Sequence, residues 1–485
     1  MKSAGMYIKS VAINNIRSVK GFKMEFKQPA GWHVLIGDNG AGKSTIIRSI
    51  ALALIGPEEA MGLRSDWGDW LSIDKEMGNI SLEIIRNEVD KHLIEDLSSL
   101  IRESKEYLAS KKIEEFISKS KENLGLEKLK VLIDKTMETI PLDEELRHLI
   151  LNNNYIFFNT LLFHRSKDRI SFTSPKTIIK PSLRNWGTGS GWFSVAYGPF
   201  RRFAGGNPEW NKVYNTQPKL GAHLSAFGED VALTEATEWL VKLKYQILEK
   251  KEDQSLIDNL KSLINSEDFL PHNTKLYDIS SDGVIFKDAG GAEISVNQLS
   301  DGYRSILSLT FELLRQLVKC YGQDLVFQSI REGVMKIDLP GVVLIDEIDA
   351  HLHPSWQTRI GSWFTKYFPK IQFIVTTHSP LVCRASENGS IWKLASPGND
   401  NDETFEIIGV DKEKLILGNV LDAYGTEFFG KSPVRSGRSN EKLERLGELN
   451  ILAALGKISD IEEKERLHLQ KILSTDDPFG SPTVK

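Results

Sequence analysis

Residues 37–45 have the residue types and the spacing of a phosphate-binding loop. They fit the pattern GxxxxGK[ST] and read Gly37, Asp38, Asn39, Gly40, Ala41, Gly42, Lys43, Ser44 and Thr45. Glycines let backbone N–H groups approach phosphate oxygens, and the helix expected to follow adds a favourable dipole. A lysine at this place meets the β- and γ-phosphates, while the hydroxyl of Ser44 holds Mg²⁺. The segment predicts a site for a nucleoside triphosphate with Mg²⁺.

Two adjacent carboxylates follow the apolar run at residues 342–345. Asp346 ends what is expected to be a buried strand, and Glu347 comes next. Strands that end in acids are common, so this pair is informative only because the phosphate-binding loop lies upstream. Asp346 would then hold Mg²⁺, and Glu347 would polarise the water that attacks the γ-phosphate.

Two further segments each have a plain structural explanation beside a functional one. Ser300 and Asp301 open a helical stretch that runs to about Cys320, and a helix N-cap alone explains both residue types. His378 follows the apolar run Phe373–Val375, where a lone histidine is more often a loop residue. Both alternatives stay open on these residues alone.

The elements that must position these residues alternate between strand and helix. The period of residues 7–14 and 21–26 predicts half-buried strands, and residues 33–36 and 43–55 predict a strand and a helix around the loop. The expected division is 1–86 as an N-terminal lobe, 87–160 as an inserted helical subdomain, 161–272 as a mixed and helical middle region, 273–410 as a C-terminal lobe, and 411–485 as a helical tail. Because the motifs must meet at one phosphate site, we expect a single discontinuous α/β head.

The composition excludes several classes of protein. The 485 residues are 40% hydrophobic and carry a net charge of −5, so no overall basic field attracts nucleic acid. The two cysteines, Cys320 and Cys383, lack the spacing of a disulfide framework or a zinc site. No apolar stretch is long enough to cross a bilayer. These features predict a cytoplasmic protein without a membrane anchor.

In chain order, the four segments resemble the ATPase heads of the ABC superfamily, with Walker A, signature, Walker B and switch histidine. The resemblance implies an α/β head with a mixed sheet around the phosphate-binding loop, helical insertions and a helical C-terminal tail. It also implies a dimer that encloses two ATP molecules, with Lys43 and Ser44 facing Ser300 and Gly302 of the other subunit. By the same resemblance, Lys43, Glu347 and His378 would be catalytic, and Asp349 would lie at the dimer seam.

Other segments narrow the resemblance. Residues 13–18 look like the start of the SMC/RecF branch, in which an arginine at the place of Arg17 reaches the nucleotide phosphates. Residues 348–356 and 196–203 are similar to bacterial AAA-labelled, ABC-type ATPases of antiphage systems, notably the Septu PtuA ATPases and their retron-associated relatives. That resemblance implies a homodimer or higher homo-oligomer that controls a separate HNH-type effector nuclease.

The chain departs from the ABC pattern in two places. Residues 197–203 contain no glutamine that could act as the Q-loop residue, and Gln217 is a distant candidate. The signature has Asp301, Gly302 and Tyr303 where transporter ATPases carry Gly-Gly-Gln. The second departure points away from transporters.

One alternative function and two alternative metal sites remain. A RecF-like DNA-repair ATPase would bind DNA directly through local basic residues. Solvated helix faces also explain these residues, which are Arg201, Arg202, Lys431, Arg435, Arg438, Lys442 and Arg445. Residues 400–402 form a DxD pattern, for which a solvated turn is the favoured interpretation over a nuclease metal site. His351 and His353 could bind a metal, but we expect them at the dimer seam.

Overall fold

The computed structural model describes residues 6–63, 67–86, 155–166, 169–173, 193–201, 217–228, 234–249, 254–266, 269–280, 283–398, 402–418, 427–429 and 437–473. The chain divides into two compact units, Met1–Ala423 and Tyr424–Lys485. The inserted helices expected at 87–154 lie outside the described residues.

A six-stranded sheet forms the centre of the first unit. In spatial order its strands are β14 (Phe405–Ile407), β13 (Ile391–Lys393), β3 (Gly31–Ile36), β12 (Ile371–Thr376), β11 (Gly341–Ile345) and β7 (Ser194–Tyr197). All pairs are parallel except β13 with β14. The inner strands are buried along their whole length, as is typical of a parallel sheet covered on both faces. Because β3, β11 and β12 are parallel neighbours, the loops after them meet at one edge.

A second, antiparallel sheet has five strands. In spatial order they are β2 (Val19–Glu25), β1 (Met6–Ile16), β4 (Met77–Arg86), β5 (Tyr155–Ser166) and β6 (Arg169–Thr173). The alternation expected for the first strands is confirmed by the burial pattern of β2. Strand β5 was not expected from the sequence, and it pairs with β4 along its length. Its first residues, 155–160, are therefore strand and not part of a helical insertion.

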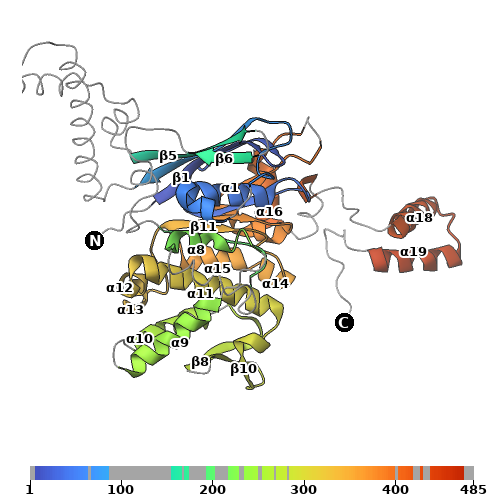
Figure 1. The fold of residues 1–485 in the computed structure, drawn as a ribbon. Coiled ribbons are helices and arrows are strands. Elements are labelled where there is room, and N and C mark those ends of the chain that lie inside the picture. Colours follow the sequence, from blue (N-terminus) through green and yellow to red (C-terminus); the bar gives the residue numbers. More distant parts are fainter. Residues whose placement is uncertain are drawn as a thin grey trace, which may run out of the picture. The chain divides into compact units, whose positions relative to one another are not determined.

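Helix α1 (Lys43–Ile55) lies between the two sheets (Figure 1). One hydrophobic cluster joins Ile46, Ile50 and Leu54 of α1 to Leu82 of β4 and Ile374 of β12. Burying each such side chain contributes about 1.5–3 kcal/mol, which fixes the helix against both sheets. The α/β fold expected from the sequence is confirmed, and the start of α1 is held rigidly at the edge where the strand loops meet.

The remaining elements of the first unit include the long helix α11 and a small three-stranded sheet (Figure 1). Their bounds are α2 (Pro57–Ala60), η1 (Met61–Leu63), α8 (Pro218–Leu224), α9 (Thr234–Leu248), α10 (Ser255–Ile264), η2 (Pro271–Asn273), β8 (Lys275–Ser280), β9 (Gly283–Lys287), β10 (Glu293–Ser295), η3 (Val296–Gln298), α11 (Asp301–Tyr321), α12 (Gln323–Val326), α13 (Gln328–Arg331), α14 (Pro354–Gln357), α15 (Ile360–Tyr367), η4 (Pro380–Asn388) and α16 (Gly409–Leu417). Thirteen consecutive residues of α11, 305–317, are buried, so the fold covers this part of the helix on all sides.

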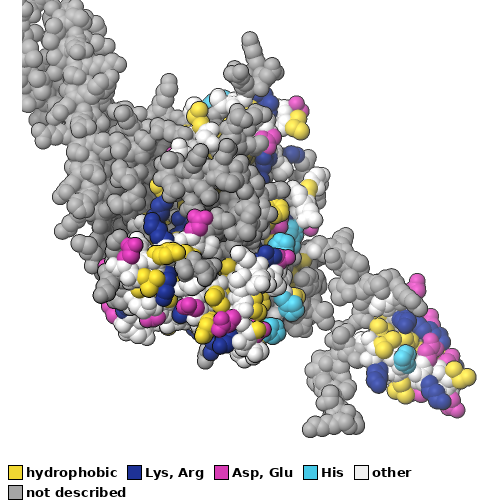
Figure 2. All heavy atoms as spheres, turned by 60° about the horizontal axis from the view of Figure 1, so that its bottom comes forward, with side chains coloured by type: hydrophobic (Ala, Val, Ile, Leu, Met, Phe, Trp, Pro, Cys, Tyr) yellow, Lys and Arg dark blue, Asp and Glu magenta, His cyan; other side chains and the backbone are white. Residues whose placement is uncertain are grey.

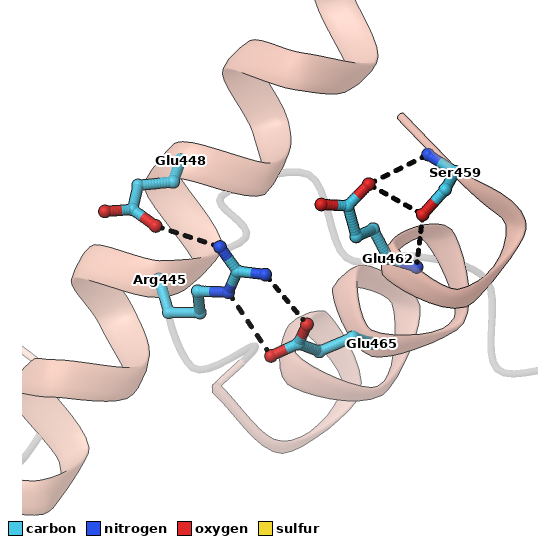
Figure 3. Close-up of polar contacts among 5 residues, drawn as sticks. All are labelled: Arg445, Glu448, Ser459, Glu462 and Glu465. Carbon is cyan, nitrogen blue, oxygen red and sulfur yellow. Dashed lines mark hydrogen bonds and ion pairs between the residues drawn. The ribbon is translucent and has the colours of Figure 1, made fainter. Parts of the chain in front are cut away.

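The second unit contains η5 (Glu427–Phe429) and a hairpin of α18 (Gly437–Ala454) and α19 (Asp460–Leu473). Arg445 of α18 binds Glu448 on its own helix and Glu465 on α19 (Figure 3). Ser459 and Glu462 form a reciprocal capping box at the start of α19. The Arg445–Glu465 contact joins the two helices, and Leu449 of α18 and Leu469 of α19 are buried. None of the described helices has both the length and the apolar content needed to cross a bilayer.

Candidate nucleotide site

The loop after β3 wraps around the ammonium group of Lys43. Gly40 and Gly42 have φ angles of 84° and 91°, which side chains with a Cβ rarely adopt. The Nζ of Lys43 donates hydrogen bonds to the carbonyl oxygens of Gly37 (2.7 Å) and Asp38 (3.0 Å). Burial lowers the pKa of Lys43, while the negative charge of Glu347 is the largest influence that opposes this shift. The lysine of the loop therefore lies in the electrostatic field of the acidic pair that follows β11.

Asp346 has one carboxylate oxygen bonded and one without a partner. The hydroxyl of Thr376 donates to Oδ1 at 2.6 Å, and the Asp346 N–H donates to the carbonyl of Tyr197 at 2.8 Å. Its Oδ2 is buried and has no hydrogen-bond partner among the described residues. An unpaired buried carboxylate oxygen is costly unless a cation binds it. Carboxylate and hydroxyl oxygens are preferred ligands of Mg²⁺, so Asp346 together with Ser44 fits this ion.

Glu347 has a left-handed backbone, with φ of 47°. A residue with a Cβ adopts this conformation at a cost of order 1 kcal/mol or more, and such residues often lie at functional sites. The Glu347 N–H donates to the hydroxyl of Thr376 at 2.7 Å, and the Ile348 N–H donates to the Thr376 carbonyl at 3.0 Å. Thr376 of β12 thus stabilises the turn that presents the Glu347 carboxylate.

Thr377, the first residue after β12, forms hydrogen bonds with the segments that carry Asp349 and His378. The hydroxyl of Thr377 donates to Oδ1 of Asp349 at 2.6 Å and accepts from the Ser379 N–H at 2.9 Å. Partial burial lowers the pKa of His378, and the positive charge of Lys43 lowers it further. The imidazole is therefore neutral at pH 7 and can donate one hydrogen bond and accept another.

The signature segment packs on residues 351–356 of the same chain. A Cβ on Gly302 would lie 2.9 Å from the carbonyl oxygen of His351, and the ring of Tyr303 lies 4.9 Å from that of Trp356. Ser300 is the N-cap residue of α11 by backbone position, but its side chain makes no capping hydrogen bond. A role as helix N-cap therefore explains the backbone position of Ser300. It does not explain why a hydroxyl side chain is present there.

Comparison with known proteins identifies the family. Residues 33–384 match the family described as "AAA domain, putative AbiEii toxin, Type IV TA system". The chain belongs to this AAA-domain family. The match spans the phosphate-binding loop, the acidic pair and the switch segment.

Two relatives of this AAA-domain protein carry the names of a retron and of Septu. It is 39% identical over 155 residues to the "Retron Ec83 probable ATPase" of Escherichia coli, which covers 31% of this chain and 27% of that protein. It is 23% identical over 431 residues to the "Septu protein PtuA" of Bacillus mycoides (strain KBAB4), which covers 87% of this chain and 45% of that protein. The chain spans less than half the length of these curated relatives.

Among solved structures, the chain is similar to an SMC head bound to the C-winged helix domain of ScpA. The two share 14% identity over 84% of this chain and 99% of the other, with a TM-score of 0.41.

Arg17 of the AAA-domain protein contacts two residues of its own chain. The Arg17 side chain pairs with Asp69 and lies 4.8 Å over the ring of Trp70. A contact between Arg17 and nucleotide phosphates, as the resemblance implied, stays a prediction. Gln217 precedes α8, and its Oε1 lies 3.7 Å from the position that a Cβ on Gly62 would take.

Thr376, Thr377 and Arg201 are parts of the site for which the sequence predicted no such role. Arg201 was considered as a contact for DNA, and that assignment is wrong because its side chain is buried, with 4% of its surface exposed. In the helical tail, Arg445 is paired with glutamates, while Lys431 and Arg435 lie outside the described residues. On the face shown in Figure 2, basic and acidic side chains of the described residues are interspersed.

Two alternative metal sites were the pair His351 and His353 and the DxD pattern at residues 400–402. Side chains of both that the structure describes form ordinary structural hydrogen bonds. The Nδ1 of His353 accepts a hydrogen bond from the Ser355 N–H at 3.3 Å and so caps α14. Asp402 accepts a hydrogen bond from the Ser396 N–H at 2.8 Å, as in a polar turn. Asp400 and Asn401 lie outside the described residues.

Proposed function

We propose that the chain binds and hydrolyses ATP with Mg²⁺ and acts as the regulatory ATPase subunit of an antiphage defence system. One observation carries the nucleotide site: Oδ2 of Asp346 is buried without a hydrogen-bond partner among the described residues, and the charge of Asp346 acts on the ammonium group of Lys43. A cation bound by Asp346 and the β- and γ-phosphates held by Lys43 would supply the missing interactions of both groups.

The residues around this site have separate roles in hydrolysis. The N–H groups of residues 37–45 and the Lys43 ammonium bind the phosphates, and Ser44 and Asp346 would hold a Mg²⁺ that would neutralise charge on them. The Glu347 carboxylate orients the attacking water and accepts its proton. The neutral His378 side chain donates a hydrogen bond to the γ-phosphate. Strain in the Glu347 backbone supports this assignment, because the fold maintains it with hydrogen bonds from Thr376 and Arg201.

A head-to-head dimer completes the proposed site. Ser300 and Gly302 of one subunit would face the phosphates bound by the other, and Asp349 would lie at the seam. Support comes from the Ser300 side chain, which makes no capping bond in its own chain, and from the amino-terminal end of α11, which suits an anion.

The defence role rests on the relatives. Two of them carry the names of Septu and retron systems, and the longer alignment covers 87% of this chain. We place the homo-oligomer in the cytoplasm and assign it a separate effector nuclease of the HNH type, whose activity changes with the nucleotide state of the ATPase.

Affinity purification of the tagged chain from its native cells, with and without ATP, tests the defence role. A nuclease that co-purifies in a nucleotide-dependent manner supports the proposal. Recovery of the chain without any nuclease or toxin contradicts it. If the purified chain instead binds DNA in an ATP-stimulated manner that weakens with salt, a RecF-like repair function replaces the defence role.

A further inference from the structure

A buried guanidinium group lies directly behind the acidic pair. The Nη1 of Arg201 donates to the carbonyl oxygens of Gly198 and Asp346, both at 2.9 Å. Its Nη2 donates to the carbonyl oxygens of Glu347 at 3.0 Å and Ile348 at 3.3 Å. One side chain therefore binds the backbone of three consecutive residues that begin at the proposed Mg²⁺ ligand.

The same guanidinium contacts the signature segment. Its Nε donates to the hydroxyl oxygen of Ser305 at 3.3 Å. Ser305 is in the second turn of α11, one turn after Gly302, and 1% of its surface is exposed. Arg201 is thus bonded both to the turn that carries Glu347 and to the helix that begins at the signature.

The fold leaves Arg201 little freedom. It follows β7, whose last residue, Tyr197, pairs with Ile345 at the end of β11. At the next position, a Cβ on Gly198 would lie 2.3 Å from the carbonyl oxygen of Ser225, so the chain turns tightly against α8. This turn directs the arginine beneath residues 346–348.

The guanidinium remains charged in this place. Burial lowers the pKa of Arg201 to about 10, and the negative charges of Asp346, Asp349 and Glu347 oppose the shift. At neutral pH its donors are therefore all present. Arginine suits this position because its planar fork donates in several fixed directions, which a lysine ammonium cannot reproduce.

We infer that Arg201 is a positioning residue, which holds Glu347 in its left-handed conformation and links that conformation to the placement of α11 through Ser305. The inference rests on the proposed ATPase function. Movement of the signature helix when a second subunit engages would be transmitted through Ser305 and Arg201 to the Glu347 backbone. The proposed site would then align its water-activating carboxylate only when α11 is in place.

Three variants of the full chain test this role: Arg201→Lys, Ser305→Ala and Ser308→Ala. Ser308 is the matched control, because it is a buried serine one turn further along α11 whose hydroxyl bonds to the Ser305 carbonyl and not to Arg201. Steady-state ATP hydrolysis gives kcat, and equilibrium titration with ATP gives Kd. Thermal unfolding reports whether each variant is folded.

A positioning role predicts that the variants lose kcat and keep their affinity for ATP. We expect Arg201→Lys to lower kcat by at least about tenfold, or about 1.4 kcal/mol, while the Kd for ATP stays within about threefold of wild type. Ser305→Ala should lower kcat by about threefold or more, and Ser308→Ala should leave it within about twofold. If Arg201→Lys does not fold, the comparison of the two serine variants decides.

Several results would overturn the inference. Equal losses of kcat and ATP affinity in Arg201→Lys would indicate a general structural role, and unchanged turnover would indicate none. Equal turnover of Ser305→Ala and Ser308→Ala would remove the link to α11. A wild-type chain that binds no ATP would contradict the proposed function itself, whereas an active wild type with an unaffected Arg201→Lys variant contradicts this inference alone.

Discussion

The hydroxyl of Thr376, at the end of β12, donates a hydrogen bond to Oδ1 of Asp346, at the end of β11. The two residues are 30 positions apart in the chain and come together because β11 and β12 are parallel neighbours. This bond leaves Oδ2 of Asp346 without a partner among the described residues and available to the proposed Mg²⁺.

Replacing Thr376 by Val should destabilise the chain. Valine keeps the shape of threonine but leaves both Oδ1 of Asp346 and the N–H of Glu347 without their partner. Buried groups without partners cost about 1–3 kcal/mol each, so we expect a loss of that order in the free energy of unfolding, measured by urea denaturation. Thr358→Val, at a helix surface, should stay within about 0.5 kcal/mol of wild type, and equal effects of the two changes would contradict this account.

The sequence was sufficient to locate the phosphate-binding loop and the acidic pair, because each depends on local spacing. It could not reveal Thr376, Thr377 or Arg201 as parts of the same site. Their partners lie on neighbouring strands, and Arg201 binds backbone carbonyl groups that leave no trace in residue types. An arginine two positions after the pair Gly198 and Pro199 was the available signal.

The α/β class was predictable from alternating elements, but the edges of its parts were not. The boundary expected after residue 160 falls inside β5, and the one after residue 410 falls inside α16. Strand β5 returns the chain to the antiparallel sheet, and a partner strand so distant along the chain has no local signal. The pairing of β5 with β4 therefore sets the residue at which the chain returns to the α/β head after the insertion.

Lys43→Ala should abolish nucleotide binding. The change removes the one ammonium group held by the loop carbonyls, and with it the charge that meets the β- and γ-phosphates. We expect the Kd for ATP to rise by at least about 100-fold, or about 2.7 kcal/mol, in a calorimetric titration. Lys23→Ala, on the exposed side of β2, is the control and should bind ATP as wild type does. Tight binding by Lys43→Ala would remove the loop from the site.

Gly302→Ala should prevent ATP-dependent dimerisation. Its Cβ would come within 2.9 Å of the His351 carbonyl oxygen, so the amino-terminal end of α11 must shift. Light scattering with ATP and Mg²⁺ should show a monomer that still binds ATP. Gly447→Ala is the matched control, since a Cβ there meets nothing within 4 Å. Full dimerisation of Gly302→Ala would contradict the place assigned to the signature.

Acid should destabilise the fold through His223. Burial lowers the pKa of His223 from 6.5 to about 4, so between these values the unfolded chain binds the proton and the folded chain does not. Its contribution is complete above pH 6.5, is lost as the pH falls to 4, and amounts to about 3 kcal/mol. His223→Asn keeps a donor for the Lys219 carbonyl, so its unfolding free energy should fall less between pH 7 and 4.5. Equal slopes for the variant and wild type would contradict the assignment.

ATP turnover by Glu347→Gln tests the proposed ATPase site most directly. Glutamine keeps the size of the side chain but cannot accept the proton from water, so kcat should fall by about 10²–10³-fold. ATP should remain bound and hold the subunits as a dimer, while Glu413→Gln, an exposed control, should turn over ATP normally. Hydrolysis by Glu347→Gln at the wild-type rate would contradict the account.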